Sequence, residues 1–109
     1  MKSVVVPINS EAAERLDLGQ EREGDLIEVK LDEPTFDALF SVGWVKHVNN
    51  AAGCNIDEHE DEHIENMGAL EKVIEVSARF SDQPEDIFGI ISSLAKQAMA
   101  RGTGLHFYF

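Results

Sequence analysis

Segments with the apolar spacing of strands and segments with the apolar spacing of helices follow one another along the chain. The order of these segments constrains the fold more than any other feature. Ser3 to Ile8 is a β-branched run that indicates a buried strand, and residues 26–31 alternate between apolar and charged side chains. Residues 105–109 form a further apolar and aromatic run, and helical spacing dominates between these segments. The pattern predicts an α+β fold: a small mixed sheet of about three strands (near 3–8, 26–31 and 105–109) covered by four to five helices. We expect the C-terminal strand to be paired inside the sheet, because a free apolar terminus would fray.

Capping residues predict where several of these helices begin and end. Acceptor side chains stand just before four of the helical runs, and glycines follow two of them. The predicted starts are at Ser10, Asp32 (followed by Pro34), Asn66 and Asp82, and the predicted ends are at Gly53 and Gly102.

The length and the lone Cys54 suit one domain over residues 1–109 without a disulfide framework. The N-terminal apolar run is shorter than a signal peptide requires. No apolar run approaches the roughly 18 residues of a membrane span. These features predict a cytoplasmic protein that does not enter a membrane.

The charge balance is strongly acidic, with 21 Asp and Glu against 9 Lys and Arg and a formal net charge of −12. Residues 1–65 carry 16 of the acids and 5 of the bases, and residues 66–109 carry the other 5 acids and 4 bases. A nucleic-acid binder needs clustered cations to replace counterions, and anionic membranes repel a chain of this charge. The charge therefore argues against direct nucleic-acid or membrane binding.

Residues 57–65, called the acidic segment below, hold six carboxylates and two imidazoles in nine positions. Such crowding of like charge destabilises a fold, so two interpretations compete. The segment is either a solvated loop or frayed helix that keeps the protein soluble, or a recognition surface for a basic partner. The predicted contact residues are Asp57, Glu58, Glu60, Asp61, Glu62 and Glu65, with Trp44 and His47 at the rim.

A third interpretation rests on residues 59–63, which match the spacing H-E-x-x-H. On a helix, this spacing puts His59 and His63 on one face as zinc ligands, with Glu60 as a general base. The acids Asp61 and Glu62 inside the motif argue against a buried catalytic helix. We therefore expect no resident metal or other cofactor, and keep a metal-dependent hydrolase as the alternative.

Two parts of the chain together resemble a known class of protein. One comprises Phe36–Phe40, Gly43-Trp44, Asn49 and Ile56-Asp57-Glu58, and the other is the closing segment Gly104–Phe109. They resemble small acidic bacterial proteins that serve as immunity partners to polymorphic or contact-dependent toxins. The resemblance implies a cytoplasmic protein without catalytic residues that blocks a basic toxin by surface complementarity.

The leading hypothesis is thus a non-enzymatic acidic protein that captures a basic protein partner. A structural or homo-oligomeric module, whose acids only prevent aggregation, is a further alternative.

Overall fold

The computed structural model describes residues 2–109, which form four strands and five helices. In chain order these are β1 (Lys2–Pro7), α1 (Ser10–Asp17), β2 (Leu26–Leu31), α2 (Glu33–Ser41), α3 (Trp44–Ala52), β3 (Asp61–Ile64), α4 (Met67–Ala78), α5 (Ile87–Arg101) and β4 (Leu105–Tyr108). The predicted α+β class is confirmed.

The four strands form one sheet in the order β2-β1-β4-β3. We expected a mixed sheet, but all three neighbouring pairs of strands are antiparallel. The additional strand, β3, lies inside the acidic segment, where three polar residues precede its only apolar one and hide the strand pattern. The C-terminal strand β4 lies between β1 and β3, which confirms that it is paired inside the sheet.

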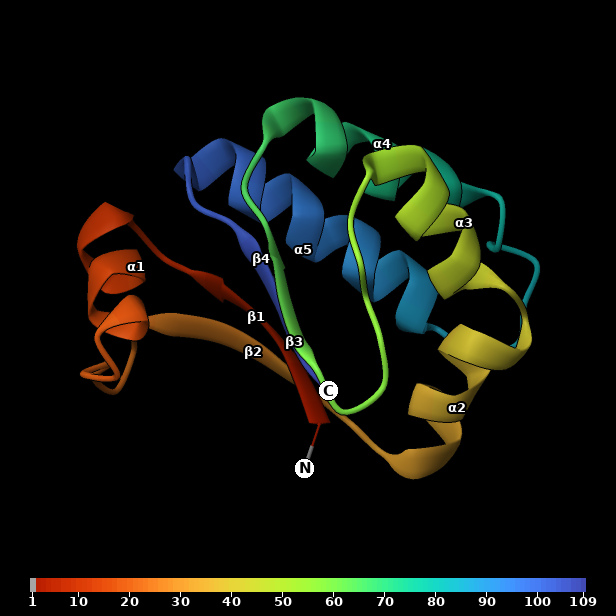
Figure 1. Ribbon diagram of the computed structural model, residues 1–109, viewed down its shortest axis with the longest axis horizontal. Helices are drawn as coiled ribbons and strands as arrows, with labels where there is room; N and C mark the ends of the chain where they lie inside the picture. The colour runs from red at the N-terminus through yellow and green to blue at the C-terminus, as the bar shows by residue number, and fades with distance from the viewer. Residues whose placement is uncertain (1) are drawn as a thin grey trace.

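Helices α2–α5 lie on one side of the sheet, and α1 lies beyond its other side (Figure 1). The inner face, towards α2–α5, carries alternate strand residues that are at most 4% exposed. They are Val4, Val6, Leu31, Ile64, Leu105 and Phe107. Trp44, Leu70 and Ile91 complete the core from the helices.

Most of the predicted helix ends are confirmed. The side chains of Asp32 and Asn66 accept the backbone N–H groups of Thr35 and Ala69, and Gly53 and Gly102 end their helices in left-handed conformations. Two predicted starts are wrong. Asn9 rather than Ser10 caps α1, because its Oδ1 accepts the N–H of Ala12 at 2.8 Å. Asp82 lies in turns that continue from α4, so α5 begins only at Ile87.

Candidate partner-binding surface

The acidic segment is neither a helix nor a free loop. Its first residues form a turn in which His59 has a left-handed φ of 68°, and residues 61–64 form the edge strand β3. Ile56, just before the segment, and Ile64, inside it, are 2% and 4% exposed. These two apolar side chains anchor the segment to the core at both ends.

Asn49 in α3 holds the loop that leads into the acidic segment. Its Oδ1 accepts the N–H of Ile56 at 2.7 Å, and its Nδ2 donates to the carbonyl of Ile56 at 3.0 Å. The thiol of Cys54 lies 3.3 Å from the same Oδ1, and burial raises the pKa of this thiol. The raised pKa disfavours the thiolate, so Cys54 is suited to packing rather than to nucleophilic attack.

The six carboxylates of the segment do not share one face, contrary to the expectation of a single acidic patch. Because successive strand residues alternate, Asp61 and His63 point to the outer face of the sheet and Glu62 to the inner side. Glu62 accepts the N–H groups of Asn55 at 2.7 Å and His63 at 3.0 Å. It is therefore engaged in shaping the loop and is not free for a partner.

The other predicted contact residues are divided between several places. Asp57 accepts the N–H of Glu58 at 2.8 Å, and Glu60 is exposed. Glu58 lies in a cleft that Lys2 lines together with three acids from the start of α2, which are the N-cap Asp32, Glu33 and Asp37.

The two residues predicted at the rim lie away from the carboxylates. Trp44 is completely buried and donates from Nε1 to the hydroxyl of Ser77 at 3.0 Å, so its assignment to the partner-binding rim is wrong. Its spacing from Val45 and Val48 places it on the apolar stripe of α3, which the structure buries. His47 is exposed, but its ring packs edge-on against Phe80, and it lines neither of the clefts that hold carboxylates of the acidic segment.

Three rings lie side by side on the outer face of β3 and β4, and we call them the ring ladder. His63 and His106 are directly opposite each other in the register and stack with centroids 5.5 Å apart. Tyr108 continues the ladder at 6.2 Å from His106, and both stacked pairs are tilted by only 18°. The ladder thus forms an aromatic stack at the edge of the sheet, with His63 exposed at one end and Tyr108 partly exposed at the other.

Carboxylates from two parts of the chain lie close enough to the ring ladder to act on the pKa values of its rings. Asp61 and Glu65 come from the acidic segment, whereas Asp17 and Glu21 come from the end of α1 and the loop after it. Sequence reasoning missed the two α1-side acids, because only the tertiary fold brings them to β4. We call these four carboxylates, with the ring ladder, the acidic ring surface.

A cleft of about 400 Å³ opens at one end of the acidic ring surface. Glu14 and Asp17 line it from α1, and Glu65, Gly104 and His106 line it from the sheet side. A Cβ at position 104 would lie 2.9 Å from Cγ of Glu65 and 3.2 Å from the carbonyl of Ile64. Glycine at this position therefore allows the Glu65 side chain to lie at the cleft.

The position of α1 over the outer face depends on an ion pair that sequence reasoning did not identify. Arg15 donates from Nε and Nη2 to the two oxygens of Asp25 at 2.8 and 2.7 Å. Asp25 also accepts the N–H of Arg22 at 2.8 Å, and these bonds lower its pKa to about 2. The bidentate pair fixes α1 to the start of β2 and so places Asp17 near the ring ladder.

The environment controls the protonation of the two rings of the ladder that β4 carries, His106 and Tyr108. His106 is only 7% exposed, and burial and nearby His63 lower its pKa, with Glu65 and Asp17 partly opposing them. Burial also raises the pKa of Tyr108, and the nearby carboxylates add to this effect. Both shifts favour the neutral form, so His106 and Tyr108 add no charge to the surface at neutral pH.

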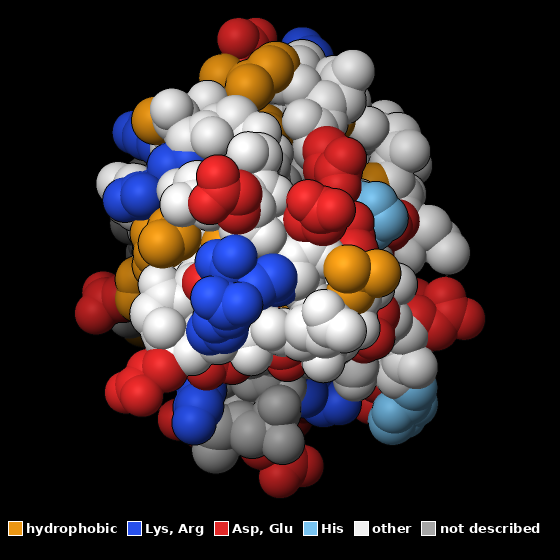
Figure 2. Space-filling model, turned by 90° about the vertical axis from the view of Figure 1, so that its left-hand side faces the viewer, with side chains coloured by type: hydrophobic (Ala, Val, Ile, Leu, Met, Phe, Trp, Pro, Cys, Tyr) orange, Lys and Arg blue, Asp and Glu red, His pale blue; other side chains and the backbone are white. Residues whose placement is uncertain are grey.

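The carboxylates of the acidic segment have no Lys or Arg partner within 4.0 Å among residues 2–109. Their nearest opposite charges are imidazoles, with His59 3.7 Å from Glu58 and His63 3.7 Å from Glu65. Figure 2 shows the α1 end of the molecule, where carboxylates lie beside a histidine and a cluster of Lys and Arg side chains lies next to carboxylates near the middle of the view. Within the described residues, the carboxylates of the acidic segment therefore form no close ion pair with Lys or Arg.

The residues of the H-E-x-x-H spacing do not form a metal centre. His59 lies in the turn and His63 in a strand, so the helix that would put both imidazoles on one face is absent. Within residues 2–109, no group of three or more His, Cys, Asp or Glu side chains is arranged to hold a metal ion.

The comparisons with known proteins add no assignment. No family model matches this chain, and no curated protein or solved structure is significantly similar to it. Over the described residues, no helix combines the length and apolar character needed to cross a membrane.

Proposed function

We propose that this protein is a non-enzymatic binding protein of the immunity or inhibitor type, which captures a basic protein such as a toxin. The observation that carries the proposal is the acidic ring surface, whose acidic-segment carboxylates have no Lys or Arg partner among residues 2–109. A net charge of −12 adds long-range attraction for a cationic partner.

The chemistry of the surface favours arginine among the basic side chains of the partner. A guanidinium stacks on aromatic faces and donates to two carboxylate oxygens at once, whereas an ammonium does neither as well. The two end rings of the ladder, His63 and Tyr108, supply the faces, because His106 is buried between them. Asp61, Glu65 and Asp17 supply the oxygens. The contact surface proposed here thus keeps Asp61 and Glu65 and adds Asp17, Glu21 and the rings.

The test uses the product of a basic reading frame adjacent to the gene as the binding partner. The test variant neutralises three acids of the surface by Asp17→Asn, Asp61→Asn and Glu65→Gln. We expect its association rate constant to fall about tenfold at low salt, because steering by local charge is lost. The difference from the wild type should shrink as ionic strength rises.

The matched control removes the same number of charges from the opposite side, by Glu71→Gln, Glu75→Gln and Asp82→Asn. These three side chains are exposed on α4 and the turn after it. We expect this control to change the rate by less than about twofold, because distant surface charges are screened. Equal losses in the two variants would show that only net charge matters, and no loss in either would place the contact elsewhere.

A further inference from the structure

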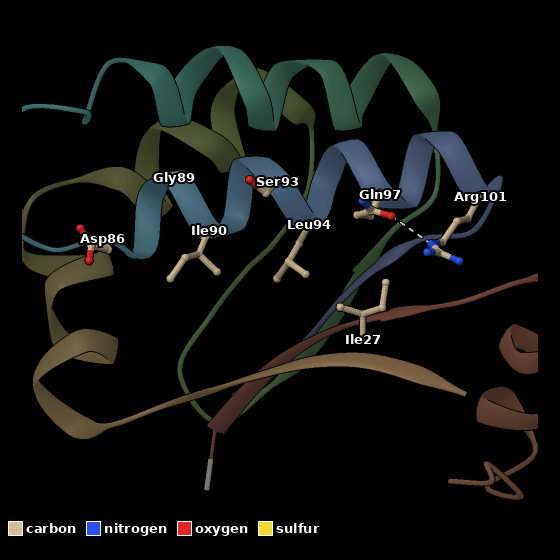
Figure 3. Close-up of a pocket in the computed structure, with 8 residues that line it drawn as sticks. All are labelled: Ile27, Asp86, Gly89, Ile90, Ser93, Leu94, Gln97 and Arg101. Atoms are coloured by element: carbon tan, nitrogen blue, oxygen red, sulfur yellow. Dashed lines mark hydrogen bonds between the residues drawn. The ribbon is translucent and has the colours of Figure 1, made fainter. Parts of the chain in front are cut away.

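The second edge of the sheet, β2, has no strand beside it within the described residues. Its inner-face side chains Ile27 and Val29 are only partly buried. Helix α5 packs mainly over β1 and β4 rather than over β2. Figure 3 shows the resulting groove, into which Ile90 and Leu94 of α5 point towards Ile27. The edge therefore combines free backbone groups with an open apolar groove.

The hydrogen-bond pattern shows which backbone groups of β2 face outward. The N–H of Ile8 donates to the carbonyl of Asp25 at 2.9 Å, so Asp25 faces β1. In an antiparallel pair this role alternates, so Ile27, Val29 and Leu31 also bond to β1. Pro7, which has no N–H to donate, stands opposite Leu26 and agrees with this alternation. The N–H and C=O groups of Leu26, Glu28 and Lys30 therefore point away from the sheet.

We propose that a second copy of this chain occupies this edge, with the two β2 strands antiparallel about a two-fold axis at Val29. In this register Glu28 of each copy lies opposite Lys30 of the other. Both residues have outward-facing backbone groups, so each such pair forms two backbone hydrogen bonds. Both side chains are exposed on the outer face, where the opposite charges attract each other.

The inner face is complementary in the same register. Val29 meets its own copy, and Ile27 lies opposite Leu31, so apolar residues meet apolar residues along the strand. Ile90, which is 38% exposed, is then covered by the helix layer of the second copy, which lies on the same side of the joined sheet. The groove carries Asp86 at one end and Arg101 at the other, so the two-fold axis brings opposite charges to each end.

Charge exchange across the edge tests the pairing by analytical ultracentrifugation over a range of protein concentrations. The wild type should show a monomer–dimer equilibrium. In Glu28→Lys or Lys30→Glu, both cross-strand pairs become like-charged, and we expect the dissociation constant to rise about tenfold or more. The double variant should restore the wild-type value, and an equimolar mixture of the two single variants should form a heterodimer.

Two further variants complete the test. Glu28→Pro removes an outward N–H without removing a bond to β1, so it should abolish the dimer while circular dichroism shows a folded chain. Lys72→Glu with Glu75→Lys exchanges the charges of an exposed pair on α4 and should leave the dissociation constant unchanged. A wild type that stays monomeric at millimolar concentration, or a dimer insensitive to Glu28→Pro, would overturn the proposal. Neither result bears on the acidic ring surface, which lies at the opposite edge.

Discussion

Replacing Trp44 by phenylalanine separates its observed role in the core from the rim role predicted by the sequence. The indole is completely buried, its ring centroid lies 6.2 Å from that of Phe107, and its Nε1 donates to Ser77 at 3.0 Å. The residue therefore joins α3 to both α4 and β4. Phenylalanine keeps the apolar contact with Phe107 but cannot donate the hydrogen bond.

The expected loss of stability follows from these contacts. The smaller ring leaves the space of two buried ring carbons, which costs about 1.5 kcal/mol at about 0.8 kcal/mol for each buried carbon group. The Ser77 hydroxyl loses its donor, which adds about 1 kcal/mol. Trp44→Phe should therefore lower the free energy of unfolding by about 2–3 kcal/mol, a large part of the stability of a small domain.

Urea unfolding followed by far-UV circular dichroism measures this loss, because Trp44 is the only tryptophan and fluorescence disappears with it. Ser77→Ala is the companion variant, and it should cost about 1–2 kcal/mol because it leaves the indole N–H without an acceptor. The double variant should cost less than the sum of the two by about 1 kcal/mol, the coupling of the bonded pair. If Trp44→Phe costs less than about 0.5 kcal/mol, or the two changes are simply additive, the buried hydrogen bond is not a stabilising contact.

Three other predictions concern titration and backbone strain. Because folding lowers the pKa of Asp25 from 3.8 to about 2, the stability from its pair with Arg15 is complete above the unfolded pKa. It should be lost between about pH 4 and pH 2, and unfolding curves of Asp25→Asn should approach those of the wild type there. The imidazole of His106 should titrate below its ordinary pKa of 6.5 in NMR spectra, and its protonation should destabilise the fold as the pH falls below that value. Replacing His59 by glycine should raise the free energy of unfolding by about 1 kcal/mol, because its φ of 68° strains a residue with a Cβ; equal stability in urea would contradict this.

Much of the fold could be predicted from local sequence patterns. The β-branched run of β1, the alternation in β2 and the apolar stripe of α4 each depend on neighbours a few residues apart, so the sequence shows them directly. The strand β3 could not be predicted, because its polar residues have a strand conformation only through pairing with β4, more than 40 residues later. Asp82 shows that a local pattern can also mislead. It matches a helix-start pattern, but it lies in the turns that follow α4, and α5 begins only at Ile87.

The candidate site was only partly predictable for the same reason. The crowding of acids at residues 57–65 is visible in the sequence, and so is the alternation that places His106 and Tyr108 on one face of β4. The arrival of Asp17 and Glu21 beside those rings depends on the ion pair that holds α1 over the sheet. No local sequence pattern predicts that these two acids lie near rings that are more than 80 residues away in the chain.

The amino-acid sequence by itself determined the α+β class, most helix ends and the strong excess of negative charge, because these follow from composition and from short-range periodicity. Only the tertiary structure decided which carboxylates share a surface, that Trp44 belongs to the core, and that β2 is left as an open edge. Those properties depend on contacts between residues far apart in the chain, and on the direction in which each side chain points once the strands are paired.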